Sequence, residues 1–201
     1  NVVYCDSLFR WEKYYCNEQL IEELKDIKLV YGIKNSRDNT IEYVTRDRAE
    51  EILKNNIFWS RKYDYIIGNP PYVGHKEMTI EYKKWLLDEY KETFKDKSDL
   101  SYCFYQRALE AAEDRGVIGF VSSRYFMESP TGRNLRRYLR DNCRRINIVD
   151  FYGEEIFPGV KVASAIFFIS KEMSNNNEIE IWKYKGSKLV NLEKKNFDIF
   201  K

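Results

Sequence analysis

The sequence predicts an α/β fold in which a parallel or mixed sheet carries helices on both faces. Short, nearly continuous apolar segments alternate with longer ones whose apolar residues recur at helical spacing. Such segments are typical of buried strands and of the helices that connect them. Two late apolar segments, 146–151 and 163–170, are separated by about a dozen residues. Because this connection is too short for a helical crossover, we expect an antiparallel hairpin at the edge of the sheet.

The expected elements follow one another along the chain in this alternating order. Strands are expected at 2–5, 63–68, 117–121, 146–151 and 163–170, with a last extended segment at 178–184. Helices are expected at 18–30, 46–56, 79–90, 99–115 and 132–143. The helix at 99–115 is expected to begin at a capping residue, Ser98 or Asp99, and to end at Gly116. Polar, turn-rich residues predict a mobile loop at 32–40 and a linker at 174–177.

Composition and charge exclude several classes of protein. With 201 residues, 43% of them hydrophobic, the chain can bury the core of one good-sized domain. Charged residues make up 33%, yet the net charge is only +2, so any basic surface for nucleic acid must be local. The four cysteines show no ligand spacing and are interpreted as free thiols of a reducing cytosol. Without a signal peptide, a long apolar run or a cluster of carboxylates, we expect a cytoplasmic protein with no membrane span and no metal site.

The most informative segment is Asn69-Pro70-Pro71-Tyr72, directly after the strand at 63–68. A loop at the carboxyl end of such a strand lies where open α/β sheets bind ligands. The prolines fix φ and have no N–H, so the loop offers two acceptors, the Asn69 side-chain oxygen and the Pro70 carbonyl. Adjacent acceptors suit a planar NH₂ group, and Tyr72 adds an aromatic face for stacking. The alternative interpretation is a plain strand-ending turn.

This tetrapeptide in this setting resembles motif IV of the amino-group methyltransferases that use S-adenosylmethionine. The order of segments from about Val2 to Lys171 is similar to that of a gamma-class adenine-N6 DNA methyltransferase of restriction–modification and phage-defence systems. The resemblance implies a Rossmann-like methyltransferase sheet in a partial catalytic domain, 1–173. Residues 174–201 would be a linker or the start of a target-recognition region. The implied reaction moves a methyl group to the N6 amine of an adenine flipped out of double-stranded DNA.

In that reaction the substrate nitrogen is a poor nucleophile, and the motif acts by positioning it. The resemblance implies that Asn69 and Pro70 accept hydrogen bonds from the amine and orient its lone pair, which needs no strong base. For the cofactor, Cys5-Asp6-Ser7-Leu8 matches the end of the motif III strand. Asp6 would accept from the adenine amine of S-adenosylmethionine, Leu8 or a neighbour would line its ring, and Asn69 would also contact it. A turn-capping role is the alternative for Asp6.

The second wall of the base pocket is expected at Phe157-Pro158, followed by Lys161, which resembles motif VIII. There Phe157 would stack on the flipped base opposite Tyr72. Extruding a base costs a few kcal/mol, and stacking returns ~1–3 kcal/mol per base, so two rings could offset the extrusion. Pro71, Lys161 and Arg124 are further candidates for substrate binding. Core packing is the alternative for Phe157, and a solvated loop is the alternative for Arg124.

Two parts of the family pattern are missing. The nine glycines contain no GxG, so no Gly-rich turn for the methionine end of the cofactor precedes Asp6, and no acidic residue for its ribose follows a second strand. We therefore expect a piece of a longer protein that is inactive alone. Other substrates remain open, namely the amino groups of cytosine N4, RNA guanine N2 or protein glutamine. A non-catalytic DNA-binding module of the same fold is also open, and the sequence predicts neither the DNA target nor the oligomeric state.

Overall fold

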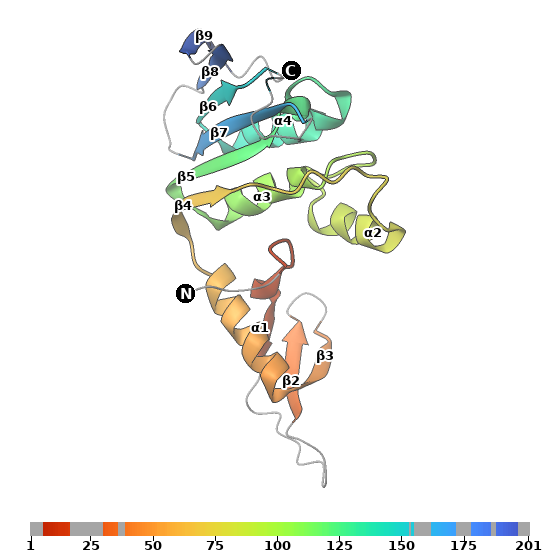
Figure 1. Ribbon diagram of the computed structural model, residues 1–201. Helices are drawn as coiled ribbons and strands as arrows, with labels where there is room; N and C mark the ends of the chain where they lie inside the picture. The colour runs from red at the N-terminus through yellow and green to blue at the C-terminus, as the bar shows by residue number, and fades with distance from the viewer. Residues whose placement is uncertain are drawn as a thin grey trace. The chain divides into compact units, whose positions relative to one another are not determined.

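The structure, a computed structural model, describes residues 6–16, 30–35, 39–152, 154, 162–171, 178–185 and 188–196. The chain divides into two compact units, 1–62 and 63–201 (Figure 1). Each unit has its own sheet. Among the described residues, no helix is long and apolar enough to cross a membrane.

The first unit packs a helix on a small antiparallel sheet. After the 3-10 turn η1 (Trp11–Lys13), the strands β1 (Tyr14–Cys16), β2 (Val30–Asn35) and β3 (Ile41–Thr45) pair in the order β1-β2-β3. Helix α1 (Arg46–Trp59) follows, which confirms the helix predicted at 46–56. Its buried Ala49 and Ile52 pack with Trp11 to form the core of this unit.

Two predictions for this region are wrong where the structure describes it. Val30 begins a strand instead of ending the helix predicted at 18–30, and residues 32–35 of the predicted loop belong to β2. The reason is the pairing with β3, which runs from Val30↔Thr45 to Lys34↔Ile41 and overrides the polar, glycine-containing local sequence. Residues 18–29 of the helix and the strand at 2–5 lie outside the described residues.

The second unit is built on a six-stranded mixed sheet in the order β4-β5-β7-β6-β8-β9. Its strands are β4 (Tyr63–Gly68), β5 (Ala112–Ser123), β6 (Arg145–Asp150), β7 (Ser164–Ser170), β8 (Glu178–Lys185) and β9 (Lys188–Asn196). The helices are α2 (Ile80–Glu89), α3 (Ser101–Ala111) and α4 (Arg133–Asn142), with 3-10 turns η2 (Arg124–Met127) and η3 (Pro130–Gly132). β4, β5 and β6 share one direction, and β7 runs against its neighbours β5 and β6. The predicted α/β fold class is thereby confirmed.

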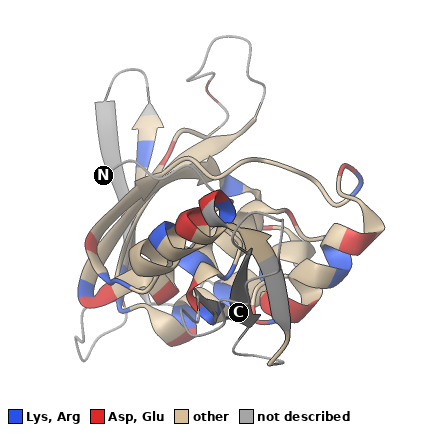
Figure 2. Cartoon of the chain, turned by 90° about the horizontal axis from the view of Figure 1, so that it is seen from below, with Lys and Arg blue, Asp and Glu red and all other residues tan. Residues whose placement is uncertain are grey.

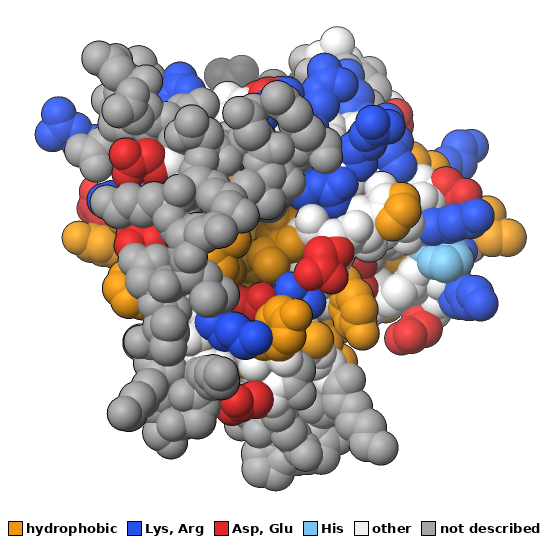
Figure 3. Space-filling view, turned by 90° about the horizontal axis from the view of Figure 1, so that it is seen from above, with side chains coloured by type: hydrophobic (Ala, Val, Ile, Leu, Met, Phe, Trp, Pro, Cys, Tyr) orange, Lys and Arg blue, Asp and Glu red, His pale blue; other side chains and the backbone are white. Residues whose placement is uncertain are grey.

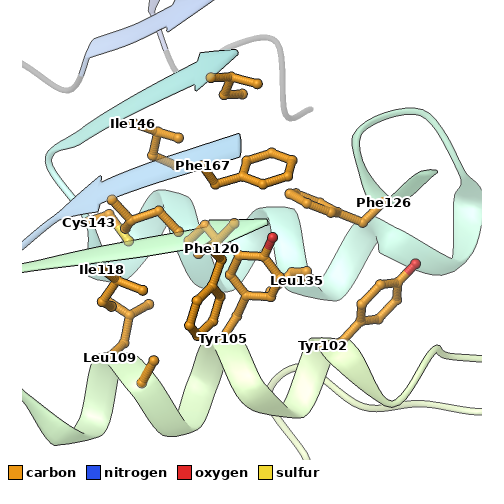
Figure 4. Close-up of a cluster of buried hydrophobic side chains, with 14 of the residues drawn as sticks. Tyr102, Tyr105, Leu109, Ile118, Phe120, Phe126, Leu135, Cys143, Ile146 and Phe167 are labelled. Carbon is orange, nitrogen blue, oxygen red and sulfur yellow. The ribbon is translucent and has the colours of Figure 1, made fainter. Parts of the chain in front are cut away.

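The main core lies between the sheet and the helices α3 and α4 (Figure 4). Tyr105 of α3 packs its ring against Phe120, Phe126 and Phe167, with centroid distances of 5.2, 5.4 and 6.0 Å. Because side chains alternate along a strand, Phe167 is fully buried on this face, whereas Phe168 on the opposite face is 45% exposed. The core therefore fixes the carboxyl ends of β4 and β5, where the candidate site begins.

Several predicted elements change at their boundaries. The helix predicted at 99–115 ends at Ala111, because Ala112 already pairs with Tyr63 of β4. Gly116 does not end a helix. It lies within β5, where a Cβ would stand 2.9 Å from the carbonyl oxygen of Tyr63. The close approach of two backbones explains this glycine.

The predicted antiparallel hairpin is present, but it does not form the edge of the sheet. β6 and β7 pair from Arg145↔Ser170 to Asp150↔Ala165. β7 inserts between β5 and β6, and β8 and β9 continue the sheet beyond β6. The length of the connection therefore predicted the pairing, while the order of the strands depended on packing of the whole sheet. Residues 178–185 and 188–196 of the segment predicted as linker or target-recognition region lie in β8 and β9.

Candidate functional site

The loop that follows β4 opens at the carboxyl edge shared by β4 and β5. Its first residue Asn69 is exposed, Pro70 is buried, Pro71 is exposed and Tyr72 is half-buried. The loop is fixed at its far end by a hydrogen bond of 3.0 Å from the Leu100 backbone N–H to the Val73 carbonyl. The two prolines stiffen the part between, so the Asn69 side chain is held at the surface of the sheet edge.

The ring of Tyr72 is partly exposed, but its hydroxyl is buried. Burial raises the pKa of Tyr72, a hydrogen-bonding contact with Ser164 opposes this rise, and the negative charge of Asp99 adds to it. The hydroxyl forms no hydrogen bond of accepted geometry with any of the described residues. The phenol therefore stays protonated at neutral pH and points inward.

A second buried tyrosine lies beneath this loop. Burial raises the pKa of Tyr105, a contact with Ser122 opposes the rise, and the nearby hydroxyls of Tyr72 and Tyr102 add to it. Figure 4 shows Tyr102 and Tyr105 projecting from α3 toward the core. The phenol of Tyr72 therefore lies near the buried phenol of Tyr105.

Arg124 stands at the carboxyl end of β5, as predicted, but its guanidinium is already engaged. Its Nε lies 3.0 Å from a carboxylate oxygen of Asp150, and one terminal nitrogen lies 2.6 Å from Glu128. Burial opposes its charge, yet Glu128 and Asp150 outweigh burial and raise the pKa of Arg124. The guanidinium also lies over the ring of Tyr152, 5.4 Å from its centroid. A role for Arg124 in substrate binding stays a prediction.

The partners of Arg124 were missed in the sequence. Asp150 ends the apolar strand β6, and its carboxylate also accepts from the Tyr152 backbone N–H at 2.9 Å. Tyr152 has a φ of 51°, in the left-handed region that non-glycine residues seldom adopt, and Lys183 lies 3.3 Å from its ring centroid. The signal that could have identified Asp150 in the sequence was its position, as an acidic residue, at the carboxyl end of β6, a strand parallel to β4.

The pairing of Arg124 and Asp150 leads to a prediction about stability. Asp150 has a side chain only 6% exposed, so Arg124→Ala would leave a nearly buried carboxylate without its cation. We expect this change to lower the free energy of unfolding by about 3 kcal/mol. Urea denaturation checks it, with Arg137→Ala as the control, because Arg137 is 76% exposed and its pair with Asp141 is long, at 3.7 Å. Equal, small losses in both variants would contradict the structural role.

The predicted cofactor residues Asp6 and Leu8 belong to the first unit. One oxygen of Asp6 accepts from the Leu8 backbone N–H at 2.9 Å, and the Asp6 carbonyl accepts from the Trp11 ring N–H at 2.9 Å. Asp6 is exposed, so a carboxylate oxygen remains accessible to an amine such as that of an adenine ring. Leu8 is 1% exposed, so of this segment its half-buried neighbours Ser7 and Phe9 present more surface for a ring. All of these roles remain predictions.

Phe157 and Lys161 lie outside the described residues, but the residues after them are placed. The Arg124 backbone N–H donates to the Ala163 carbonyl at 3.0 Å, and Ser164 pairs with Ser123 at the end of β5. Ser164 also lies near enough to the Tyr72 hydroxyl to oppose the rise of its pKa. The structure therefore brings Ser164, at the end of the segment that resembles motif VIII, near the loop that resembles motif IV, although the two are far apart in the sequence.

Charges of both signs are spread over the described ribbon (Figure 2), and Figure 3 shows several Lys and Arg side chains gathered on one part of the face seen there. On α4, Arg133 and Arg137 are exposed, whereas Arg136 is buried. Arg136 donates to the carbonyls of Phe126 and Ser129 at 2.6 and 2.8 Å, so it holds η2 against the helix.

Comparisons with known proteins identify the family of the chain. A family model described as Eco57I restriction-modification methylase matches residues 5–157. The type II restriction enzyme and methyltransferase RM.Eco57I of Escherichia coli is 24% identical over 156 residues, which cover 75% of this chain and 15% of that protein. The type II methyltransferase M.HincII of Haemophilus influenzae is 32% identical over 124 residues, covering 60% and 25%. The chain thus spans a quarter or less of the length of these relatives.

Solved structures support the same fold. A nuclease-deletion mutant of the type ISP restriction-modification enzyme LlaGI, in complex with a DNA substrate mimic, aligns with a TM-score of 0.55 and 23% identity over 72% of this chain and 14% of that one. The type IIL restriction-modification enzyme MmeI, in complex with DNA, aligns with a TM-score of 0.53 and 19% identity over 81% and 22%. At these identities the likeness shows the fold alone.

Proposed function

Because the chain belongs to the Eco57I restriction-modification methylase family, we propose that it is part of the catalytic region of a DNA methyltransferase. The proposed reaction transfers a methyl group from S-adenosylmethionine to the exocyclic N6 amine of an adenine extruded from double-stranded DNA. The observation that carries the proposal is the loop after β4, with an exposed amide at Asn69 and a half-exposed ring at Tyr72.

The proposed chemistry needs little more than positioning. The amide oxygen of Asn69 and the carbonyl of Pro70 accept hydrogen bonds from the amine. These bonds reduce the delocalisation of the nitrogen lone pair into the heterocycle and direct the lone pair away from the ring. The ring of Tyr72 stacks on the base. The cofactor, when bound, supplies an electrophilic methyl group. Asp6 offers an exposed carboxylate that fits the adenine amine of the cofactor.

DNA as the partner is part of the same proposal. LlaGI and MmeI were solved with DNA or a DNA mimic, and both share this fold with the chain. The exposed Arg133 and Arg137 of α4 offer charge for phosphates. Phe157, Pro71 and Lys161 are the other residues proposed to line the pocket for the extruded base.

The test is nucleoside mass spectrometry of DNA from methylation-free cells that express the protein at its full encoded length. We expect N6-methyladenine with the wild type and much less of it with Asn69→Ala. The pair of acceptors at Asn69 and Pro70 would also suit the N4 amine of cytosine, so finding N4-methylcytosine instead would change the substrate and keep the chemistry. Absence of any methylated base in DNA, with the protein folded and expressed, would refute the proposed function.

A further inference from the structure

Tyr152, just after β6, combines an unusual backbone conformation with an exposed aromatic ring. Its φ is 51°, a value in the left-handed region that costs energy for a residue with a large side chain. The ring is 60% exposed, so burial in the core does not compensate for this cost. Backbone strain of this kind gathers at functional sites, where the surrounding structure maintains it.

Three charged side chains hold Tyr152 in this conformation. Asp150, at the end of β6, accepts a hydrogen bond of 2.9 Å from the Tyr152 backbone N–H. Arg124 binds the same carboxylate, and its guanidinium carbon lies 5.4 Å from the centroid of the tyrosine ring. Lys183 pairs with Asp150 in the parallel ladder of β6 and β8, and its ammonium nitrogen lies 3.3 Å from the same centroid. The ring is therefore fixed to the sheet on both sides of β6.

Tyr152 lies at the same edge of the sheet as the loop after β4. The strands β4, β5 and β6 share one direction, and Gly68 at the end of β4 is level with Ile148 of β6. In the order β4-β5-β7-β6 the two strands are three spacings apart, or roughly 14 Å. This separation is close to the width of a major groove, about 12 Å. Tyr72 and Tyr152 can therefore contact the same short stretch of duplex.

The surroundings of Tyr152 favour a contact through the ring over a contact through charge. Two cations, Arg124 and Lys183, lie at the ring, and the carboxylates of Asp150 and Glu128 offset their charge. An aromatic ring that is already fixed loses little conformational freedom on binding. Every nucleobase offers a flat face to such a ring. The chemical class that fits Tyr152 is therefore a nucleobase and not a phosphate.

We propose that Tyr152 is a DNA-binding residue whose ring stacks on a base left unstacked at the site of extrusion. The inference rests on the proposed function, because extrusion of the target is what removes a stacking partner from the bases around it. Tyr152 contributes to the affinity for DNA and not to the transfer step, since the reacting amine is bound at the loop after β4. The strained turn and the exposed ring are then parts of one device, a stacking surface presented to DNA.

Two substitutions at the same position separate the ring from the rest of the residue. Tyr152→Asn removes the ring and tolerates a positive φ, whereas Tyr152→Phe removes only the hydroxyl. The full-length protein is tested by filter binding and by methyl transfer, with DNA from methylation-free cells. We expect Tyr152→Asn to raise both the Kd and the KM for DNA about tenfold, with kcat changed less than about threefold. Tyr152→Phe should stay within about twofold of the wild type. An equal loss in both variants would assign the effect to the hydroxyl and overturn stacking.

The matched control is Tyr125→Asn. Tyr125 is 61% exposed and follows Arg124 at the end of β5, but its φ is not positive. The control should leave the Kd for DNA within about twofold of the wild type. An equal rise in Kd with Tyr125→Asn would show that any exposed tyrosine at this edge has the effect, which overturns the assignment to Tyr152. Urea unfolding without DNA verifies the fold, and Tyr152→Gly, which also accepts a positive φ, replaces Tyr152→Asn if that variant is unfolded.

Filter binding distinguishes failure of this inference from failure of the proposed function. If the wild type binds DNA but methylates none of it, the proposed function fails, and the Kd values of the Tyr152 variants still decide whether the ring contacts DNA. If the wild type methylates DNA and Tyr152→Asn leaves both Kd and KM unchanged, the proposed function stands and this inference is overturned.

Discussion

Asn69→Ala is expected to lower kcat for methyl transfer by about 10²–10³-fold, the loss that follows removal of one preorganised hydrogen-bonding group at a reacting centre. Asn69 is exposed at the carboxyl end of β4, where truncation leaves the fold intact. The KM for DNA should change little, because the base still stacks on Tyr72. Radiolabelled methyl transfer by the full-length protein, with circular dichroism to verify the fold, measures both quantities.

The matched control is Asn69→Asp, which keeps an oxygen acceptor at the same place and removes only the amide NH₂. If acceptance from the amine is the role of Asn69, the aspartate variant should retain more activity than the alanine variant. Equal losses would show that the NH₂ group, and so a contact other than the substrate amine, is what matters. Wild-type activity in both variants would remove Asn69 from the mechanism.

The second large effect is expected on stability, at Phe167 in the middle of β7. Its side chain is fully buried and packs on Tyr105 and on Phe126, with centroid distances of 6.0 and 5.0 Å. Phe167→Ala removes this ring from a core that can close the cavity only in part, and we expect a loss of about 3–5 kcal/mol in the free energy of unfolding. Urea denaturation monitored by circular dichroism measures it.

The neighbouring Phe168 is the control for that change. It is the same residue type on the same strand, but its side chain lies on the opposite face of the sheet and is 45% exposed. Phe168→Ala should cost at most about 1 kcal/mol, since less apolar surface is lost and no cavity forms. If the two variants lost equal stability, the assignment of the core to the face covered by α3 and α4 would be wrong.

Local sequence was enough for some parts of the fold and failed for others. The strand at 63–68 and the helix at 79–90 were predicted nearly to the residue, because the spacing of apolar residues is a local signal. The structure adds that Thr79 caps this helix by accepting from the Tyr82 backbone N–H at 3.2 Å. β2 and the first residues of β5 were missed, because they exist by pairing with strands distant in the sequence.

The candidate site divides in the same way. The Asn69–Tyr72 loop was predicted from four consecutive residues after a strand, whereas Asp150 was not singled out. The position of Asp150 matters because of a contact across the sheet with Arg124. Such contacts follow from strand order, and the sequence placed the hairpin of β6 and β7 at an edge instead of beside β5.

The sequence by itself determined the stiff acceptor loop, its place at the end of a strand and the α/β class, because each depends on neighbouring residues or on a short period. Only the tertiary structure decided which side chains reach that loop. The first residues of β7 reach the end of β5, beside Arg124, because β7 inserts between β5 and β6, and this pairing joins strands that are far apart in the sequence.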